Sequence, residues 1–250
     1  MSKDAVVIIP ARFSSQRLPG KPLVQIGDKP LIQWVYERAL QIKQAKQVLI
    51  ATDDQRVESV AKKFQANVVM SPSNIASGSE RVGFVAQNLD AEIIANLQGD
   101  EPFISPEAVD EAILALKNES GLNISTLACP LDSEDEWRNP SVVKVLVDKA
   151  MNALYFSRSP IPFFRDDNYS TLKHAKKHIG VYVFRKSFLM QFLQWEETPL
   201  EKAEKLEQLR ILENGYKIRV IITENNSIGV DTPDDVTYIE TLIKNREVSF

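Results

Sequence analysis

The most constraining feature of this sequence is the alternation of short apolar runs and amphipathic segments over its first 120 residues. The first run, Ala5 to Ile9, is wholly apolar and rich in β-branched residues, and it stops at Pro10. Such a run is typical of a strand that is buried on both faces. Three more apolar runs follow, with segments of helical spacing between them; the runs cover 48–51, 68–70 and 93–96, and the helical segments 31–42, 54–64, 79–89 and 106–117. This alternation predicts an α/β fold, a mostly parallel sheet flanked by helices.

The pattern changes after residue 120. Strand-like segments then dominate, and they cover 124–128, 142–147, 153–157 and 179–184. They predict a β-rich lobe at about 123–185, inserted into a single domain that spans 1–250. Helical segments at 187–193 and 200–213, a strand at 218–222 and a last helix from about 233 complete the chain.

Charge and cysteine content exclude several classes of protein. A formal net charge of −4 argues against a general nucleic-acid or anionic-membrane binder. The single cysteine, Cys129, excludes an intrachain disulfide and a Cys-rich metal site. No apolar run approaches the roughly 18 residues that span a bilayer, and the N-terminal run is too short for a signal peptide. We therefore expect a cytoplasmic protein with no nucleic-acid or membrane partner.

A basic loop follows the first strand. Residues 10–22 contain two arginines, a lysine, two serines and a glycine, and match neither the P-loop nor the dinucleotide fingerprint. In open α/β sheets ligands bind at the carboxyl ends of strands. Arginine and lysine together suit a polyphosphate. A solvated basic loop is the simpler alternative, and the position after a buried strand favours the phosphate site.

Two separated acidic segments suggest a cation site. Asp100 follows the strand at 93–96 within Gln-Gly-Asp-Glu-Pro, and Asp231 lies in Gly-Val-Asp-Thr-Pro near the last helix. Magnesium prefers one or two carboxylates together with substrate phosphate oxygens. The alternative for the second segment is helix capping, which we assign to Asp234 and Asp235. The residue pattern alone leaves the role of Asp231 open.

Other candidate residues have ordinary structural explanations when each is considered alone. The segment 77–81, Ser-Gly-Ser-Glu-Arg, is a common helix start. His174 lies in a Lys-rich loop, and His178 precedes a strand-like segment that would bury it as a structural histidine. The charged run 199–210 has the spacing of a solvated helix face. No Ser/His/Asp or Cys/His arrangement for nucleophilic catalysis is apparent.

Taken together, the motifs resemble one family closely. They occur in the order of that family and cover nearly the whole chain; the matching segments are 9–23, 51–54, 77–81, 96–102, 155–158, 178–182, 206–210 and 229–233. The N-terminal loop is shared with other cytidylyltransferases. The set Gln-Gly-Asp-Glu-Pro, His-x-Gly-x-Tyr and Leu-Glu-Gln-Leu-Arg is much more specific. The chain resembles the CMP-Kdo synthetases, the 3-deoxy-manno-octulosonate (Kdo) cytidylyltransferases.

This resemblance implies a Rossmann-like nucleotide-diphospho-sugar transferase fold and a Mg²⁺-dependent reaction. The anomeric hydroxyl of a 2-keto sugar acid attacks the α-phosphorus of CTP, giving a CMP-sugar for lipopolysaccharide biosynthesis and pyrophosphate. The implied nucleotide-binding residues are Ala11, Arg12, Ser14, Ser15, Lys21, Ser77, Gly78, Arg81 and Gln98. The implied sugar-binding residues are Gln98, Arg158, His178, Tyr182, Glu207 and Gln208. Lys21, Asp100 and Asp231 are implied as catalytic, with Asp100 and Asp231 as the metal ligands, and the lobe at 123–185 as the sugar-binding and dimerisation part of a homodimer.

One segment departs from the family pattern. Family members commonly carry His-x-Ser-Gly-Thr, whereas this chain has Ile75 and Ser79 at the outer positions. The exact acceptor is therefore left open between Kdo and a form modified at C8, such as the 8-amino analogue. Two alternatives are a CMP-sialic-acid-type synthetase, which the Leu-Glu-Gln-Leu-Arg segment disfavours, and a non-catalytic nucleotide-sensing module, which the intact Asp100 and Asp231 disfavour.

Overall fold

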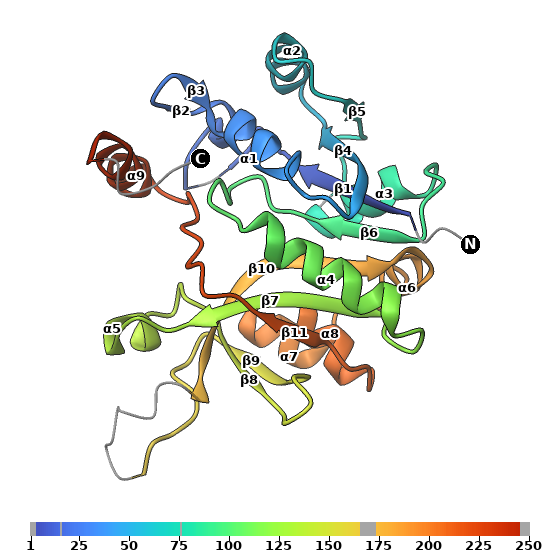
Figure 1. The fold of residues 1–250 in the computed structure, drawn as a ribbon, viewed down its shortest axis with the longest axis vertical. Helices are drawn as coiled ribbons and strands as arrows, with labels where there is room; N and C mark the ends of the chain where they lie inside the picture. The colour runs from blue at the N-terminus through green and yellow to red at the C-terminus, as the bar shows by residue number, and fades with distance from the viewer. Residues whose placement is uncertain (1–3, 16, 76, 166–173, 246–250) are drawn as a thin grey trace.

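The protein is built around one twisted sheet with helices on both faces (Figure 1). The structure is a computed structural model that describes residues 4–15, 17–75, 77–165 and 174–245. The strand order is β11-β7-β10-β6-β1-β4-β5. Its members are β1 (Ala5–Pro10), β4 (Ala45–Thr52), β5 (Val68–Met70), β6 (Ile93–Asn96), β7 (Ile124–Pro130), β10 (Lys176–Arg185) and β11 (Arg219–Ile222).

Most strands run in one direction, as predicted. β1 pairs in parallel with both β4 and β6, β4 with β5, and β11 with β7. β10 is antiparallel to both of its neighbours on this path, β6 and β7. The predicted α/β fold with a mostly parallel sheet is therefore confirmed.

The pattern of β1 explains how the two layers form. All six of its residues are buried. Val7 and Ile9 pack into the core on one face of the sheet, whereas Val6 and Ile8 pack into the core on the other. Because successive side chains of a strand point to opposite faces, only a wholly apolar run can fill both cores.

Helices from different parts of the chain cover the two faces. The core that contains Val7 includes residues of α1 (Leu31–Ala39), α2 (Gln55–Lys63), α4 (Pro106–Asn118) and α9 (Pro233–Asn245). The core that contains Val6 includes residues of α3 (Gly78–Ala86), α6 (Lys186–Phe192) and α8 (Gln208–Glu213). Figure 1 looks onto the face that α4 crosses. Each of the predicted helices and strands of the first 120 residues is present within a few residues of its expected bounds.

The strand-rich segment at 123–185 does not form a separate unit. β7 and β10 are strands of the central sheet, and only β8 (Lys144–Val147) and β9 (Ala153–Ser157) lie off its main path. β8 is joined to the sheet through β10 and carries β9 at its other edge. The expected lobe is therefore reduced to a two-stranded extension with short α5 (Glu134–Arg138) beside it. Its predicted roles in sugar binding and dimerisation stay predictions.

The predicted helix over 200–213 is two helices. α7 (Pro199–Glu204) is capped by Lys205, whose φ of 55° is left-handed. α8 begins three residues after Lys205. The short elements η1 (Lys21–Leu23), β2 (Gln25–Ile26) and β3 (Lys29–Pro30) complete the fold between β1 and α1.

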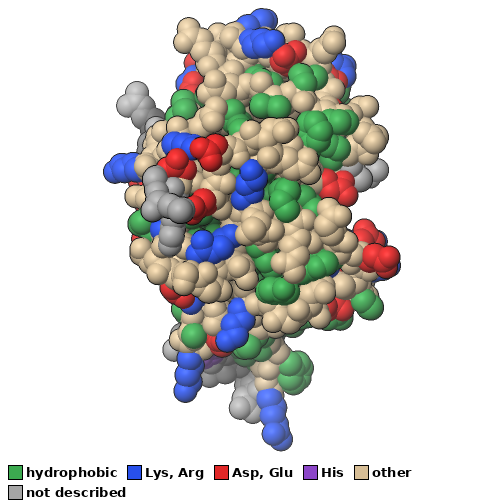
Figure 2. Space-filling view, turned by 90° about the vertical axis from the view of Figure 1, so that its right-hand side faces the viewer, with side chains coloured by type: hydrophobic (Ala, Val, Ile, Leu, Met, Phe, Trp, Pro, Cys, Tyr) green, Lys and Arg blue, Asp and Glu red, His purple; other side chains and the backbone are tan. Residues whose placement is uncertain are grey.

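The distribution of charge on the surface agrees with the small net charge of the sequence (Figure 2). On the face shown in Figure 2, basic and acidic side chains are interspersed rather than gathered into a patch of one sign. In the described part of the chain, no helix is both long and apolar enough to cross a membrane.

The close approach of two loops yields a test of the fold. A Cβ added at Gly99 would lie 2.9 Å from the carbonyl oxygen of Pro10, at the end of β1. Backbone cannot yield cheaply, so we expect Gly99→Ala to cost about 1–3 kcal/mol of unfolding free energy, or several degrees in Tm. Gly121→Ala meets nothing within 4 Å and should change stability by less than about 0.5 kcal/mol. Equal melting temperatures for the two variants would contradict this account.

Candidate active site

The candidate site lies where the carboxyl ends of β1 and β6 meet. The chain leaves β1 toward β4 and β5 and later returns to β6 on the other side of β1, so these ends form a topological switch point. Open α/β sheets bind ligands in the crevice at such a point. The basic loop follows β1, and the Gln-Gly-Asp-Glu-Pro segment follows β6.

A first pocket, of about 230 Å³, collects most of the predicted nucleotide residues. We refer to it as the loop pocket. Its lining includes Ala11, Arg12, Ser14, Ser15, Lys21, Gly78, Gln98 and Asp100. The basic loop and the start of α3 thus lie together in the fold. The arginine and lysine supply positive charge, and the serines supply hydroxyl donors, which together suit a polyphosphate.

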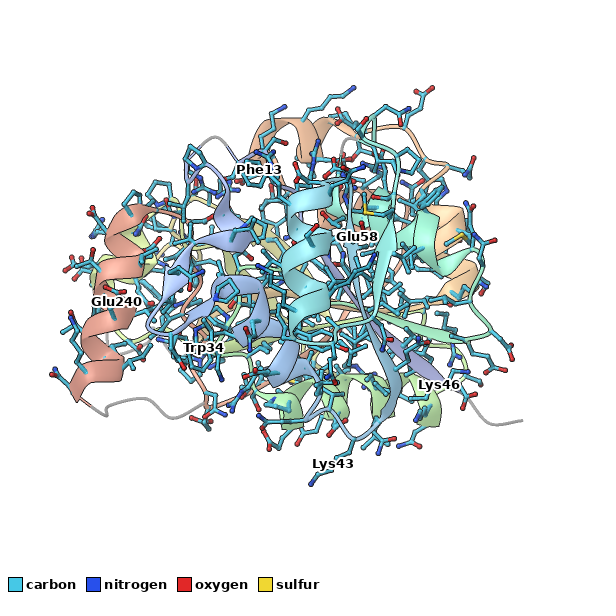
Figure 3. All side chains as sticks on the ribbon, turned by 90° about the horizontal axis from the view of Figure 1, so that it is seen from above. Phe13, Trp34, Lys43, Lys46, Glu58 and Glu240 are labelled. Atoms are coloured by element: carbon cyan, nitrogen blue, oxygen red, sulfur yellow. The ribbon has the colours of Figure 1, made fainter. Side chains whose placement is uncertain are left out.

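Phe13 fixes the shape of the basic loop. Its ring lies 3.2 Å from where a Cβ of Gly20 would be, and Gly20 has a φ of +69°. The guanidinium of Arg56, in the first turn of α2, stacks on the Phe13 ring, 3.4 Å from the ring centroid. Figure 3 shows Phe13 on this loop beside α2. Glycine permits both the left-handed turn and the close contact, and the turn delivers Lys21 to the crevice.

Lys21 joins the two predicted metal ligands. Its ammonium lies 2.5 Å from Asp100 Oδ2 and 2.8 Å from Asp231 Oδ1. Arg17 adds a second cation, 3.1 Å from Asp231 Oδ1. Burial alone would lower the pKa of Lys21, but the charges and hydrogen bonds of the two carboxylates outweigh burial and raise it.

A backbone hydrogen bond explains how residues 131 positions apart converge. The N–H of Val230 donates to the carbonyl of Asp100 at 2.9 Å, which fixes the chain before α9 against the loop after β6. Asp235 then accepts from the N–H groups of Asp231 and Thr232, at 2.9 and 2.7 Å. Its predicted role at the helix start is confirmed. Asp234 is exposed.

The chemistry of this donor set fits a magnesium ion. Two carboxylates converge on one cationic group, so a divalent cation placed between them would meet two hard oxygen ligands. In the residues that the structure describes, no group of three or more His, Cys, Asp and Glu side chains could form a metal cage. A cation held by Asp100 and Asp231 would therefore take its other ligands from water and phosphate, as magnesium does.

A second pocket, of about 960 Å³, adjoins the first. We refer to it as the wide pocket. Gln98 lines both pockets, and the wide pocket also contains Arg158, His178, Tyr182, Gln208 and Asp231. Four of the five residues predicted for the sugar alone thus share one cavity, which meets the loop pocket at Gln98 and the carboxylate pair.

Hydrogen bonds define the state of His178. Thr126 donates its hydroxyl proton to the carbonyl of Val181 at 2.7 Å, and the same oxygen lies 2.9 Å from His178 Nε2. The hydroxyl must therefore accept from Nε2–H, which leaves Nδ1 without a proton. Burial lowers the pKa of His178 to about 3, so the ring is neutral. The sequence interpretation of a merely structural histidine is incomplete, because this side chain lines the wide pocket.

The break between α7 and α8 brings polar side chains inward. Glu207 accepts a hydrogen bond from Ser79 at 2.6 Å and lines a small cavity that it shares with Tyr182 and Gln208. Glu207 is thus one layer behind the wide pocket. Gln208 is only 4% exposed, and none of the described residues bonds its Nε2. Burial, with the charge of Glu207, raises the pKa of Tyr182 well above its ordinary value.

The expectation of a solvated face over 199–210 holds only in part, because Lys202 and Lys205 are exposed but other charged side chains of the run are not. Glu201 is 5% exposed and forms a buried ion pair with Arg210 at 2.5 Å. Charge alternation at helical spacing does not distinguish such an internal pair from a surface pair.

Two predicted nucleotide residues are used elsewhere. The side chain of Arg81 is fully buried, pairs with Asp53 at 3.0 Å and donates to Ser71, so it contributes nothing to the wall of either pocket. The hydroxyl of Ser77 caps α3 in a reciprocal arrangement with Glu80. Gly78, between them, is the member of this segment that reaches the loop pocket.

Glu101 is a site residue that the sequence reasoning did not assign. It lines the wide pocket next to Asp100, and the hydroxyl of Ser227 donates to its Oε2. Burial, with the charge of Asp100, raises its pKa to about 7. In the sequence, the position of Glu101 next to Asp100 is the signal that could have identified it as a site residue. Only the fold shows that Glu101 lines the wide pocket.

Comparisons with known proteins agree with this arrangement. A family model described as cytidylyltransferase matches residues 6–218. A 3-deoxy-manno-octulosonate cytidylyltransferase from Solibacter usitatus (strain Ellin6076) is 48% identical over 244 residues, which cover 98% of this chain and 96% of that protein. One from Geotalea daltonii (strain DSM 22248 / JCM 15807 / FRC-32) is 46% identical and covers 96% and 98%.

Solved structures extend the comparison to three dimensions. CMP:2-keto-3-deoxy-manno-octonic acid synthetase complexed with CTP matches with a TM-score of 0.90 at 40% identity, over 97% of this chain and 99% of that one. A 4-diphosphocytidyl-2C-methyl-D-erythritol synthase from Anaerococcus prevotii, at 14% identity and a TM-score of 0.66, shares the fold. With the family model, the near full-length relatives and the fold in agreement, the chain belongs to the cytidylyltransferase family, among the 3-deoxy-manno-octulosonate cytidylyltransferases.

Proposed function

We propose that this cytidylyltransferase transfers CMP from CTP to the anomeric hydroxyl of Kdo, or of a Kdo modified at C8, and releases pyrophosphate. The product would be an activated sugar acid of the kind used in lipopolysaccharide biosynthesis. The observation that carries the proposal is the junction of two pockets at Gln98 and the Asp100–Asp231 pair. The loop pocket carries the basic side chains that suit phosphate groups, and the wide pocket is large enough for a second substrate. The two pockets meet where the two substrates would have to react.

The residues of the loop pocket suit a triphosphate that must be held and neutralised. Transfer of a phosphoryl-type group needs positioning and charge stabilisation more than covalent chemistry. Arg12 and Lys21 would pair with phosphate oxygens, and the serines would donate hydroxyl protons. Lys21 would exchange its carboxylate partners for phosphate oxygens, because its present partners are the residues proposed to hold the cation.

We propose that Asp100 and Asp231 hold magnesium. When bound there, the ion would neutralise the phosphate charge and lower the pKa of a hydroxyl near it. A hydroxyl activated in this way would need no strong base from the protein, and the bare Nδ1 of His178 is a weak base because burial lowers the pKa of the ring to about 3.

The wide pocket suits an acidic sugar. Arg158 can donate to a carboxylate from Nη2, because its Nε and Nη1 donate to main-chain carbonyls, and the bare Nδ1 of His178 can accept a hydrogen bond from a hydroxyl. The unpartnered Nε2 of Gln208 offers a further donor. Ser79, which replaces the threonine of the family pattern, donates its hydroxyl proton to Glu207. The replacement would therefore influence the wide pocket through the position of Glu207.

The test of the proposed function is pyrophosphate release from CTP and Mg²⁺ with each of three acceptors. We expect release with Kdo or its 8-amino analogue and at least about a hundredfold lower kcat/KM with a sialic acid, because the donors of the wide pocket are fixed by the fold. Preference for sialic acid would support the other synthetase class. If no acceptor led to pyrophosphate release, the result would contradict the proposed enzyme and support a non-catalytic nucleotide-sensing module.

Asp100→Asn tests the carboxylate pair. We expect kcat/KM to fall at least about a hundredfold, because one charged ligand is lost where phosphate charge must be stabilised. The fold should persist, since Lys21 keeps Asp231 as its partner. Asp234→Asn, at an exposed position of α9, is the matched control and should retain activity. Full activity of the Asp100 variant would remove this residue from the proposed metal site.

The state of His178 predicts a dependence of stability on pH. Its pKa is about 3 in the folded protein against 6.5 for an ordinary histidine. Between these values the unfolded chain binds a proton that the folded chain does not, so the free energy of unfolding falls as the pH drops below about 6.5. His178→Gln should lose less stability than the parent between pH 7 and pH 5 in urea unfolding. His174→Gln, at an exposed position, is the control, and identical curves for His178→Gln and the parent would contradict the assignment.

A further inference from the structure

Lys144 is a fully buried lysine at the start of β8, next to Val143 in the lining of the wide pocket. The residue has an exposed fraction of 0%. Its ammonium donates to three main-chain carbonyls, those of Asn139 at 3.0 Å, Val142 at 2.7 Å and Arg158 at 2.6 Å. These bonds use all three protons of the group.

The partners of Lys144 are neutral. Among the described residues, no carboxylate forms an ion pair with it, and burial lowers the pKa of Lys144. Glu204 attracts the ammonium only from beyond ion-pair distance, so burying this cation costs free energy that the three hydrogen bonds only partly offset. The three carbonyls therefore define what Lys144 contributes.

These carbonyls belong to two walls of the wide pocket that are not adjacent in sequence. Asn139 and Val142 lie in the segment between α5 and β8, and Arg158 follows β9; all three line the pocket. Lys144 thus ties one wall to the backbone of the arginine on the other.

The rest of Arg158 is held by the same surroundings. Its N–H donates to Glu204 Oε2 at 2.9 Å, its Nε to the carbonyl of Glu204 at 2.9 Å, and its Nη1 to the carbonyl of Pro140 at 3.1 Å. None of the described residues holds Nη2. The guanidinium is therefore fixed through carbonyls that do not neutralise it, with one nitrogen left for a ligand.

We propose that Lys144 is a positioning residue for acceptor recognition: by holding the Arg158 carbonyl and the 139–142 segment together, it aims the Arg158 guanidinium at the carboxylate of the sugar acid. This rests on the proposed function, in that a sugar carboxylate is the ligand of Arg158. Lys144 does not itself touch either substrate; it acts through the backbone of Arg158.

The test compares Lys144→Met with Lys144→Gln. Methionine keeps the length of the side chain and removes every donor, whereas glutamine keeps two N–H donors without the charge. We expect Lys144→Met to raise the KM for the acceptor about tenfold or more, with the KM for CTP unchanged and kcat altered less than about threefold. Lys144→Gln should lie between Lys144→Met and the parent, and it carries the test if Lys144→Met does not fold.

Lys186→Met is the matched control. Its ammonium also donates to carbonyls, those of Gln87 and Leu89, but it lies at the start of α6 and lines neither the loop pocket nor the wide pocket. It should leave both KM values unchanged.

A double-mutant cycle separates positioning from general support of the fold. If Lys144 acts through Arg158, the acceptor KM of Arg158→Ala should not rise further when Lys144→Met or Lys144→Gln is added. Additive effects, an equal rise in the KM for CTP, or parent-like kinetics of both Lys144 variants would overturn the proposal. Failure of the parent protein to turn over any Kdo-type acceptor would instead overturn the proposed function.

Discussion

The burial of β1 between β4 and β6 is the constraint on which the rest of the structure depends. Every residue of β1 is buried and its side chains serve two cores, so no polar group for chemistry can reside within the strand itself. Polar function has to begin where the strand ends, at Pro10. The neighbouring β6 ends at the same edge, and the loops that follow the two strands form the loop pocket.

Much of the fold could be predicted because its signals are local and repeated. The wholly apolar strands, the helical spacing between them and a cap such as Ser105, whose hydroxyl accepts from the N–H of Ala108, are each readable from a few neighbouring residues. The convergence of Asp100 and Asp231 is suggested by the residue pattern and implied by the resemblance, and the structure supplies its cause in a backbone bond between Val230 and Asp100. The sequence therefore predicts correctly that the residues following β1 and β6 lie at one edge of the sheet.

The rest of the site could not be predicted because its determinants are tertiary. Arg81 looks like a free cation at a helix start, but the fold buries it against Asp53, so its charge is spent on a structural pair. The left-handed turn at Lys205, which no glycine or proline marks, divides a helix that the charge pattern presented as continuous. Lys144 looks like an ordinary strand lysine, and its three carbonyl partners lie up to fourteen positions away from it along the chain. In each case burial, rather than residue type, decides the role.

β10 is the single antiparallel strand on the main path of the sheet. Its direction determines where residues of the candidate site occur in the sequence relative to their strands. Because β10 runs opposite to β6, its opening half lies at the edge where its neighbour ends, and Tyr182 pairs with Asn96 there. His178 and Tyr182 thus lie within their strand, with His178 ahead of its apolar part, whereas Asp100 follows β6. Part of the candidate site therefore lies inside a strand, so a search confined to residues that follow strands would find Asp100 and miss His178 and Tyr182.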